Sequence, residues 1–298
     1  MPNPLEVRDL AKQFGSVAAL RGVTFSVEPG EVFGYLGPNG AGKTTTLRII
    51  LGLARATSGS VSLFSRAPRD PDSRLDIGFV PGDLRLYGDM TAAATLDYFA
   101  RFRPAKPPRL RETLVDALNL DGAALGRRVK FLSHGTRQKV GLIAAMQHDP
   151  ALLLLDEPTN GLDPLVQHSF RAVVADFAAR GRAVLLSSHV LSEVETVCNR
   201  VAILREGALV ALETIERLRE KVVRKLTVRF RGDAPPGLAG TPGIARSEIH
   251  GAQASLWIQG DVNPVLRAIS TAGVEDLVFP EAELEDIFLG YYDAERNG

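Results

Sequence analysis

The chain has 298 residues, 45% of them hydrophobic and 23% charged, a composition that suits a globular protein with one large domain and a smaller one. Lysine and arginine number 35, and so do aspartate and glutamate, so the balanced charge gives no electrostatic footprint for nucleic acid and we expect no nucleic-acid partner. The single cysteine, Cys198, excludes an internal disulfide and fits a reducing cytoplasm, and no apolar run reaches the roughly 20 residues that span a bilayer.

The N-terminal part of the chain is predicted to form short strands around one helix. Apolar and polar residues alternate between turn signals within residues 4–36, which indicates β-strands. A helix is expected from Gly42 to about Leu53, and strand character returns at residues 58–62 and 77–80. Strands that alternate with a helix in this way are typical of an α/β domain with a parallel component.

A helical pattern interrupts this order in the middle of the chain. Apolar residues recur at helical spacing between about residues 87 and 130, and we expect a helical subdomain at about residues 87–148, inserted into the α/β core. Continuous apolar runs at residues 151–155 and 182–187 predict buried strands. The core sheet therefore returns after the insertion.

Composition changes near residue 218, so we expect a first domain over residues 1–217 and a second, small α+β domain over residues 218–298. The second domain is predicted to contain a strand, a hairpin, a short helix capped by Asn263, a further strand and a final helical face. In the same order, these features are residues 226–230, 244–249 with 252–258, 263–273, 274–279, and the apolar set Leu284, Ile287, Phe288 and Tyr291.

Residues 37–44 read GPNGAGKT, which satisfies the P-loop pattern and lies between an apolar strand and a helix. The glycines let backbone amides turn toward phosphate oxygens, and the helix presents its positive end to the same anion. We expect Lys43 to contact the β- and γ-phosphates of ATP and the Thr44 hydroxyl to bind Mg²⁺. The predicted ATP-binding residues of this loop are Gly37, Pro38, Asn39, Gly40, Ala41, Gly42, Lys43, Thr44 and Thr45.

A second signal is the apolar run at residues 152–155, which delivers Asp156 and Glu157 to the end of a buried strand. Asp156 is suited to hold Mg²⁺, and Glu157 can orient and deprotonate an attacking water molecule. Taken alone, such a pair is equally well explained as a solvated turn at a strand end. Its position downstream of a P-loop favours the catalytic interpretation.

Several further motifs resemble those of the ATP-binding cassette family, in the order in which that family has them. The segment LSHGT at residues 132–136 resembles the signature motif, and the acidic pair runs into a segment like the D-loop, which ends near Asp163. His189 matches the switch histidine, and Phe14 matches the A-loop aromatic that stacks on adenine. The resemblance covers residues 1 to about 215.

The resemblance implies a P-loop NTPase cassette with an N-terminal antiparallel β subdomain, a RecA-like core and the inserted helical subdomain. It implies ATP hydrolysis with Glu157 and His189 as catalytic residues, and ATP and Mg²⁺ as cofactors. It also implies a homodimer, because the signature site of one subunit reaches the γ-phosphate on the other. The further ATP-binding residues that it implies are Phe14, Ser133, His134, Gly135 and Asp163.

The chain departs from the family pattern after the strand at residues 77–80. A glutamine that contacts Mg²⁺ and water usually follows this strand, whereas this chain has Gly82 and Asp83. Either Asp83 or a bound water replaces that contact, or the metal is held without it, and we expect altered coupling to a membrane partner. His134 and Thr136 also replace the commoner glycine and glutamine of the signature, but the amides at the helix start survive both changes.

The C-terminal domain resembles the accessory domain of ATPases from drug and antibiotic exporters, whose membrane half is a separate polypeptide. We therefore expect the ATPase subunit of an exporter, held at the inner face of the cell membrane by a permease. A soluble cassette ATPase outside transport and an ATP-dependent regulatory module are the alternatives, although a module without turnover would be expected to lose Glu157. The domain can equally be an appendage that stabilises the dimer, and the transported substrate is not encoded here.

Overall fold

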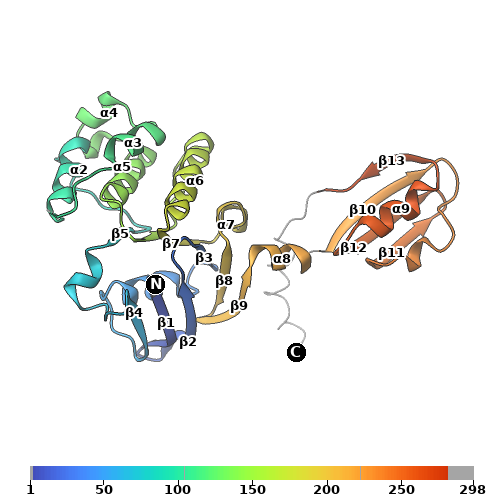
Figure 1. Cartoon of the computed structure of the whole chain (residues 1–298), viewed down its shortest axis with the longest axis horizontal. Coiled ribbons are helices and arrows are strands. Elements are labelled where there is room, and N and C mark those ends of the chain that lie inside the picture. The colour runs from blue at the N-terminus through green and yellow to red at the C-terminus, as the bar shows by residue number, and fades with distance from the viewer. Residues whose placement is uncertain (1–2, 104, 222, 281–298) are drawn as a thin grey trace. The chain divides into compact units, whose positions relative to one another are not determined.

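The computed structural model describes residues 3–103, 105–221 and 223–280. The chain divides into two compact units, residues 1–213 and 214–298, slightly before the change in composition near residue 218 (Figure 1). Among the described residues, no helix combines the length and the hydropathy that crossing a bilayer requires. Each unit is described by itself below.

The centre of the first unit is a six-stranded sheet in the order β5-β6-β7-β3-β8-β9. Neighbouring strands from β5 to β8 pair in parallel, and every residue of β3, β6 and β7 is buried. Burial of both faces explains the continuous apolar runs in the sequence. The strands are β3 (Val32–Leu36), β5 (Ile77–Val80), β6 (Leu152–Asp156), β7 (Ala183–Ser188), β8 (Arg200–Arg205) and β9 (Ala208–Thr214).

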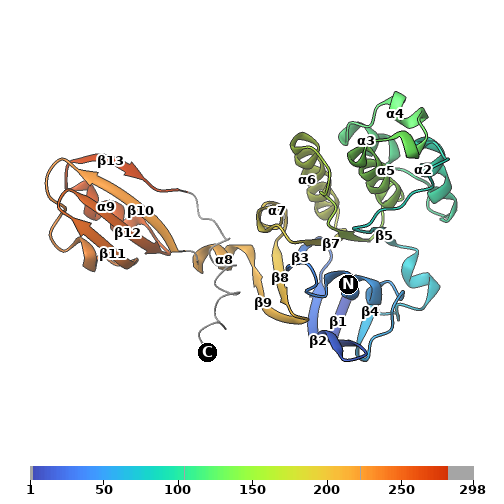
Figure 2. The same ribbon diagram turned by 180° about the vertical axis from the view of Figure 1, so that it is seen from behind.

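Three helices pack on this sheet, and a second sheet lies beside it. Helix α1 follows β3 after the loop of residues 37–42 and contacts β6. Helix α6 packs against β7, and α7 packs against β3 and β7 (Figure 2). The second sheet is antiparallel, in the order β2-β1-β4, as the N-terminal strand pattern predicts. The bounds are α1 (Lys43–Ile50), α6 (Pro164–Ala179), α7 (Leu191–Val197), β1 (Leu5–Phe14), β2 (Val17–Val27) and β4 (Ser58–Leu63).

The helical subdomain leaves the core sheet after β5 and returns at β6, in the place that the sequence predicts. Helices α2 and α3 pack on α5, and the buried amide of Gln147 donates to the carbonyl of Leu96 in α2 at 2.9 Å. Thr91 begins α2 because its hydroxyl accepts from the Ala94 amide. The helices are α2 (Ala92–Arg101), α3 (Arg111–Ala117), α4 (Gly122–Gly126) and α5 (His134–Met146).

The second unit contains a four-stranded antiparallel sheet in the order β11-β12-β10-β13, with α9 packed on one face. Counted along the chain, this order matches a split β-α-β module of the ferredoxin-like type, with its first helix reduced to a 3-10 turn at Leu238–Gly240. Helix α8 precedes the sheet. The bounds are α8 (Ile215–Lys221), β10 (Val223–Phe230), β11 (Ile244–His250), β12 (Gln253–Gln259), α9 (Asn263–Ser270) and β13 (Val274–Val278).

One expectation for α9 is wrong. Asn263 is not the capping residue but the first residue of the helix, which Val262 precedes and which ends at Ser270 rather than near Gly273. The side chain of Asp261 takes the capping role in a different form, because it accepts from the Asn263 amide at 2.9 Å. The final helical face predicted at Leu284, Ile287, Phe288 and Tyr291 lies outside the described residues.

Candidate nucleotide site

The P-loop joins the end of β3 to the start of α1, and its backbone path requires glycine. Gly40 and Gly42 have φ angles of 83° and 111°, and a Cβ atom on Gly42 would lie only 2.6 Å from the carbonyl oxygen of Ala19. A cavity of about 150 Å³ lies at this loop. Its lining consists of Ala19, Pro38, Asn39, Gly40, Gly42, Lys43, Thr44, Thr45 and Glu157.

The side chain of Lys43 is buried within the loop. Its ammonium donates to the carbonyl oxygens of Gly37 at 2.6 Å and Pro38 at 3.2 Å, and lies 3.7 Å from a carboxylate oxygen of Glu157. Burial lowers the pKa of Lys43, while the negative charges of Glu157 and Asp156 act in the opposite direction. The loop therefore holds a cation next to the carboxylate that follows β6.

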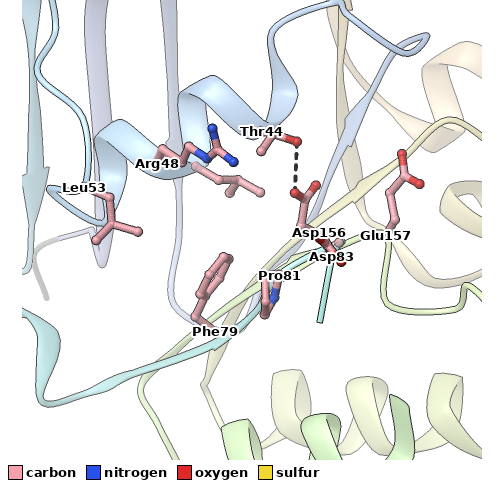
Figure 3. Close-up of a pocket in the computed structure, with 10 residues that line it drawn as sticks. Thr44, Arg48, Leu53, Phe79, Pro81, Asp83, Asp156 and Glu157 are labelled. Atoms are coloured by element: carbon pink, nitrogen blue, oxygen red, sulfur yellow. Dashed lines mark hydrogen bonds between the residues drawn. The ribbon is translucent and has the colours of Figure 1, made fainter. Parts of the chain in front are cut away.

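Thr44 and Asp156 meet across the gap between α1 and β6. Figure 3 shows the Thr44 hydroxyl donating to one carboxylate oxygen of Asp156, at 3.0 Å, and the Ser187 hydroxyl on β7 donates to the other. In residues 3–103, 105–221 and 223–280, no group of three or more His, Cys, Asp or Glu side chains is arranged so that it could hold a metal ion by itself. A hydroxyl and a carboxylate are oxygen ligands that suit Mg²⁺, provided that phosphate and water supply the others.

Glu157 stands in a left-handed backbone conformation, with φ of 48°. Its carboxylate accepts from the Asn160 amide at 2.8 Å and lies 3.1 Å from Nδ1 of His189. Burial by itself raises the pKa of Glu157, but the hydrogen bonds from Asn160 and His189 and nearby positive charge outweigh it, so the pKa lies below its ordinary value. Since a carboxylate only accepts hydrogen bonds, Nδ1 of His189 carries the proton.

Ser133 caps α5, because its hydroxyl accepts from the Thr136 amide at 3.1 Å. The first turn of this 13-residue helix contains no acidic residue, so its positive end is not neutralised from within. Neither Ser133 nor His134 nor Gly135 lines the cavity at the P-loop. Within one chain, the structure therefore keeps the signature segment apart from the P-loop.

The start of α5 packs on the loop that follows Glu157. A Cβ atom on Gly135 would lie 2.5 Å from the carbonyl oxygen of Gly161, and Gly161 in turn lies against the ring of His134. One turn further along α5, the buried amide of Gln138 donates to the carbonyl of Pro158 at 3.0 Å. The signature segment and the predicted D-loop are thus held together. No sequence motif predicts the contact that Gln138 makes.

Comparisons with known proteins agree with these motifs. A sequence model of the ABC transporter family matches residues 20–160. The Nod factor export ATP-binding protein I of Burkholderia pseudomallei is 33% identical over 96% of both chains, and its counterpart in Cupriavidus metallidurans is 32% identical over 96% of both. This chain belongs to the ATP-binding proteins of the ABC transporter family.

Solved structures agree with the cassette fold. The structure of an ATP-binding subunit of an ABC transporter, 32% identical, aligns with a TM-score of 0.68 over 72% of this chain and 91% of its own. A dimeric bacterial ABC transporter cassette, 23% identical, aligns with a TM-score of 0.65 over 71% of this chain and 98% of its own. The predicted P-loop NTPase cassette is confirmed, and this ABC protein is an ATPase.

Phe14 and Asp163, like the signature residues, do not line the P-loop cavity of this ABC ATPase. Phe14, the last residue of β1, is 54% exposed, and the ammonium of Lys12 lies over its ring, 4.6 Å from the centroid. Asp163 caps α6, with its carboxylate accepting from the Val166 amide at 2.9 Å. Phe14 thus offers a free aromatic face, and the described contacts of Asp163 are structural.

Gly82 lies beside the Asp156 carboxylate, in a cavity of about 490 Å³ that also borders Thr44 and Glu157. A Cβ atom on Gly82 would lie 3.4 Å from the nearer oxygen of Asp156, which is ordinary contact, so the backbone leaves room for a side chain. The carboxylate of Asp83 is bonded to Arg85, at 2.7 and 2.9 Å. No described contact joins Asp83 to Thr44 or Asp156.

Glu193 on α7 is a residue of the ABC site that the sequence reasoning missed. It accepts from the Thr159 hydroxyl at 2.6 Å and from the Ser188 hydroxyl at 2.7 Å. Thr159 follows Glu157, and Ser188 precedes His189, so Glu193 fastens the two catalytic segments to each other. Its spacing of four residues after His189 is the one signal that could have drawn attention to it.

Proposed function

We propose that this ABC ATPase is the energy-supplying subunit of an exporter whose permease is a separate polypeptide. The observation that carries the exporter assignment is the extent of the similarity to Nod factor export ATP-binding proteins, which covers 96% of both chains. It therefore includes the C-terminal unit as well as the cassette. We propose that the permease holds the chain at the inner face of the membrane and selects the substrate.

In the proposed mechanism, the P-loop amides and Lys43 bind the phosphates of ATP. The buried ammonium of Lys43 stabilises the negative charge of the γ-phosphate during its transfer. Thr44 and Asp156 would hold Mg²⁺, which would supply positive charge to the phosphate groups of ATP. Glu157, kept ionised by its surroundings, orients and deprotonates the attacking water. His189 fixes the Glu157 carboxylate through Nδ1 and contacts the γ-phosphate.

We propose that two chains complete each other's sites. The capped start of α5, with Ser133, His134 and Gly135, offers amides to an anion but lies apart from the P-loop cavity of its own chain. A second copy places this half-site on the γ-phosphate that the first copy binds. Phe14, exposed at the end of β1, stacks on the adenine ring, and Asp163 lies on the loop that faces the partner.

The helical subdomain is the proposed docking site for the permease. Tyr87 and Phe102 are 59% and 58% exposed, and both make edge-to-face contacts with Tyr98 on α2. Exposed aromatic side chains that gather in this way are typical of protein interfaces. Gly82 lies on the segment that joins this subdomain to β5, next to the metal-binding carboxylate.

Hydrolysis by the purified chain, with Glu157→Gln as the test variant, examines the catalytic assignment. Loss of the general base should reduce kcat by about 10² to 10⁴, while the binding of a fluorescent ATP analogue is retained. Glu112→Gln, on the exposed side of α3, is the matched control and should leave kcat unchanged. Full activity in Glu157→Gln would exclude this residue as the base.

The exporter assignment is tested with the permease. The chain and a candidate permease are placed together in vesicles, with ATP supplied on the side where the ATPase subunit is bound. We expect permease-stimulated hydrolysis and movement of substrate away from the ATP side, and neither with Glu157→Gln. Movement toward the ATP side would identify an importer and contradict the assignment.

A further inference from the structure

The sheet of the C-terminal unit has one face that no described element covers. Helix α9 packs Val265 and Ile269 on the face that contains Leu226 and Val228. Alternate residues of a strand point to opposite faces, so Lys225, Thr227 and Arg229 of β10 lie on the other face, and all three are exposed.

Trp257 stands in the middle of this open face, between two cations on the neighbouring strands. In register, Lys225 on β10 and Arg246 on β11 flank Trp257 on β12. The Lys225 ammonium lies 5.1 Å from the centroid of the indole ring and the Arg246 guanidinium 4.6 Å. Two like charges share one ring, and Glu248 pairs with only one of them, Arg246. An anionic group lying across the row would stabilise both.

Apolar side chains lie on the same face, on both sides of the row formed by Lys225, Trp257 and Arg246. Val223, two residues before Lys225, is exposed, and Val278 of β13, paired with Thr227, is 55% exposed. Exposed valines beside a tryptophan are the contacts that an amphipathic segment would cover. The face thus combines positive charge with apolar surface.

The chain itself continues beyond β13 with a segment that has the complementary character. Residues 281–298 contain six carboxylate side chains and one arginine, together with apolar residues at helical spacing. The acidic residues are Glu281, Glu283, Glu285, Asp286, Asp293 and Glu295, and the apolar ones at this spacing are Leu284, Ile287, Phe288 and Tyr291.

This segment also starts at the row. The Arg224 guanidinium stacks on the ring of Phe279 at 3.7 Å and donates to the carbonyl of Pro280 at 2.5 and 3.1 Å, which holds the end of β13 against β10. These two side chains lie on the face that α9 covers, but the register that pairs Thr227 with Val278 brings Pro280 level with Lys225 on the neighbouring strand. Since neighbouring strands lie about 4.8 Å apart, Arg246 on β11 is roughly 14 Å from the β13 edge, a span of about five extended residues. Glu285 and Asp286, five and six residues after Pro280, can therefore reach Arg246, whereas Glu281 and Glu283 can reach only Lys225, one strand away.

We propose that residues 281–298 bind back onto this open face, with their carboxylates on Lys225 and Arg246 and their apolar side chains against Trp257. The short tether gives the segment a local concentration in the millimolar range, so a weak interaction suffices. The inference concerns the C-terminal unit and does not depend on the proposed function.

Trp257 is the only tryptophan in the chain, so its fluorescence reports on the proposed contact directly. We compare the full chain with a chain that ends at Pro280 and with a full-length variant in which the first four acidic residues become amides. Both variants should shift the emission to longer wavelength and increase quenching by acrylamide. The amide variant has Glu281→Gln, Glu283→Gln, Glu285→Gln and Asp286→Asn.

A synthetic peptide of residues 281–298 should bind the shortened chain, reverse both changes and release at high salt. The double variant Lys225→Glu and Arg246→Glu of the shortened chain should fail to bind it, whereas Arg267→Glu, on α9, should bind normally. Equal emission and quenching in the full and shortened chains would overturn the proposal, and so would a peptide that does not bind. If the change in emission disappeared on dilution at the concentration where a dimer dissociates, the face would bind a second copy of the chain instead. If an oligonucleotide bound the face and the peptide did not, the face would be a nucleic-acid site.

Discussion

At the scale of single residues, the feature that decides the chemistry is the fixed carboxylate of Glu157. Its left-handed φ of 48° costs on the order of 1 kcal/mol for a residue with a side chain, and such strain persists only where the surroundings impose it. The Glu157 amide donates to the carbonyl of Ser187, while Asn160 and His189 hold the carboxylate. The proposed base is therefore oriented before ATP arrives.

The depressed pKa of Glu157 predicts the acid limb of the pH profile. The base acts as a carboxylate, so kcat falls as pH drops through its pKa, which lies below the ordinary 4.5. Asn160→Ala removes the largest contribution that lowers this pKa, so the acid limb should move to higher pH, measured as kcat against pH at saturating ATP. Asn263→Ala, in the C-terminal unit, is the control and should leave the profile in place. If the acid limb of Asn160→Ala stayed in place, the ionisation that limits kcat would belong to a group other than Glu157.

Glu193 predicts a positioning effect, since it touches both catalytic segments but no predicted ligand. Glu193→Gln keeps the size of the side chain but offers one accepting oxygen to two hydroxyls, Thr159 and Ser188, and should lower kcat by about 10- to 100-fold, as expected for second-layer residues. KM for ATP should stay near that of the parent. A merely structural role would instead lower the melting temperature with kcat intact, and Glu112→Gln serves again as the control.

At the scale of elements, the segment after β5 couples the metal site to the helical subdomain. Gly82 has room for a side chain next to Asp156, and Asp83 is bonded to Arg85 rather than to the site. The structure therefore supplies neither the family's glutamine nor a described replacement for it. In the proposed mechanism, hydrolysis without the permease then depends on Thr44 and Asp156, and we expect coupling to depend on the backbone of this segment.

Gly82→Gln is therefore expected to leave the fold intact and change coupling. Because its Cβ makes only ordinary contact, the free energy of unfolding should change by no more than about 0.5 kcal/mol. The added amide reaches the Asp156 carboxylate and should alter the stimulation of hydrolysis by the permease. Gly126→Gln, at an open position at the end of α4, is the control. If stimulation and transport were both unchanged, this position would have no part in coupling.

At the scale of the whole molecule, the proposed pairing of two chains predicts complementation. Lys43→Ala destroys the P-loop half of a site, and Ser133→Arg destroys the signature half, so each variant alone should be inactive. Mixed in equal amounts, half of the dimers contain one intact site, so about a quarter of the parental activity should return. Mixing Lys43→Ala with Glu157→Gln is the control, since both defects lie in the same half-site and no intact site forms. No recovery in the first mixture would contradict the shared site.

The sequence predicted the parts of this site that depend on local pattern. The P-loop with Lys43 and the strand that ends in Asp156 are continuous segments, and parallel strands buried on both faces leave a clear apolar run. The fold of the cassette followed from their order. The roles assigned to single residues, such as Phe14, remain predictions.

Other features could not be predicted, because they join chemically ordinary residues that are far apart in sequence. Glu193 meets Thr159 across 34 positions, and Gln138 meets Pro158 across 20, so only the packing of α5 and α7 brings them together. The prediction that Asn263 caps α9 was wrong for a local reason. Asp261 lies two residues before Asn263, and its side chain accepts a hydrogen bond from the Asn263 amide.

The contact between Gly135 and Gly161 has a consequence for how two nucleotides are sensed. In the proposed dimer, the start of α5 serves the ATP of the other chain, while the loop with Gly161 continues directly from Glu157 and its own ATP. Because a Cβ atom on Gly135 would lie 2.5 Å from the Gly161 carbonyl, neither segment can shift without displacing the other. In that dimer, we therefore expect a displacement at one nucleotide to be passed to the other through the contact between Gly135 and Gly161.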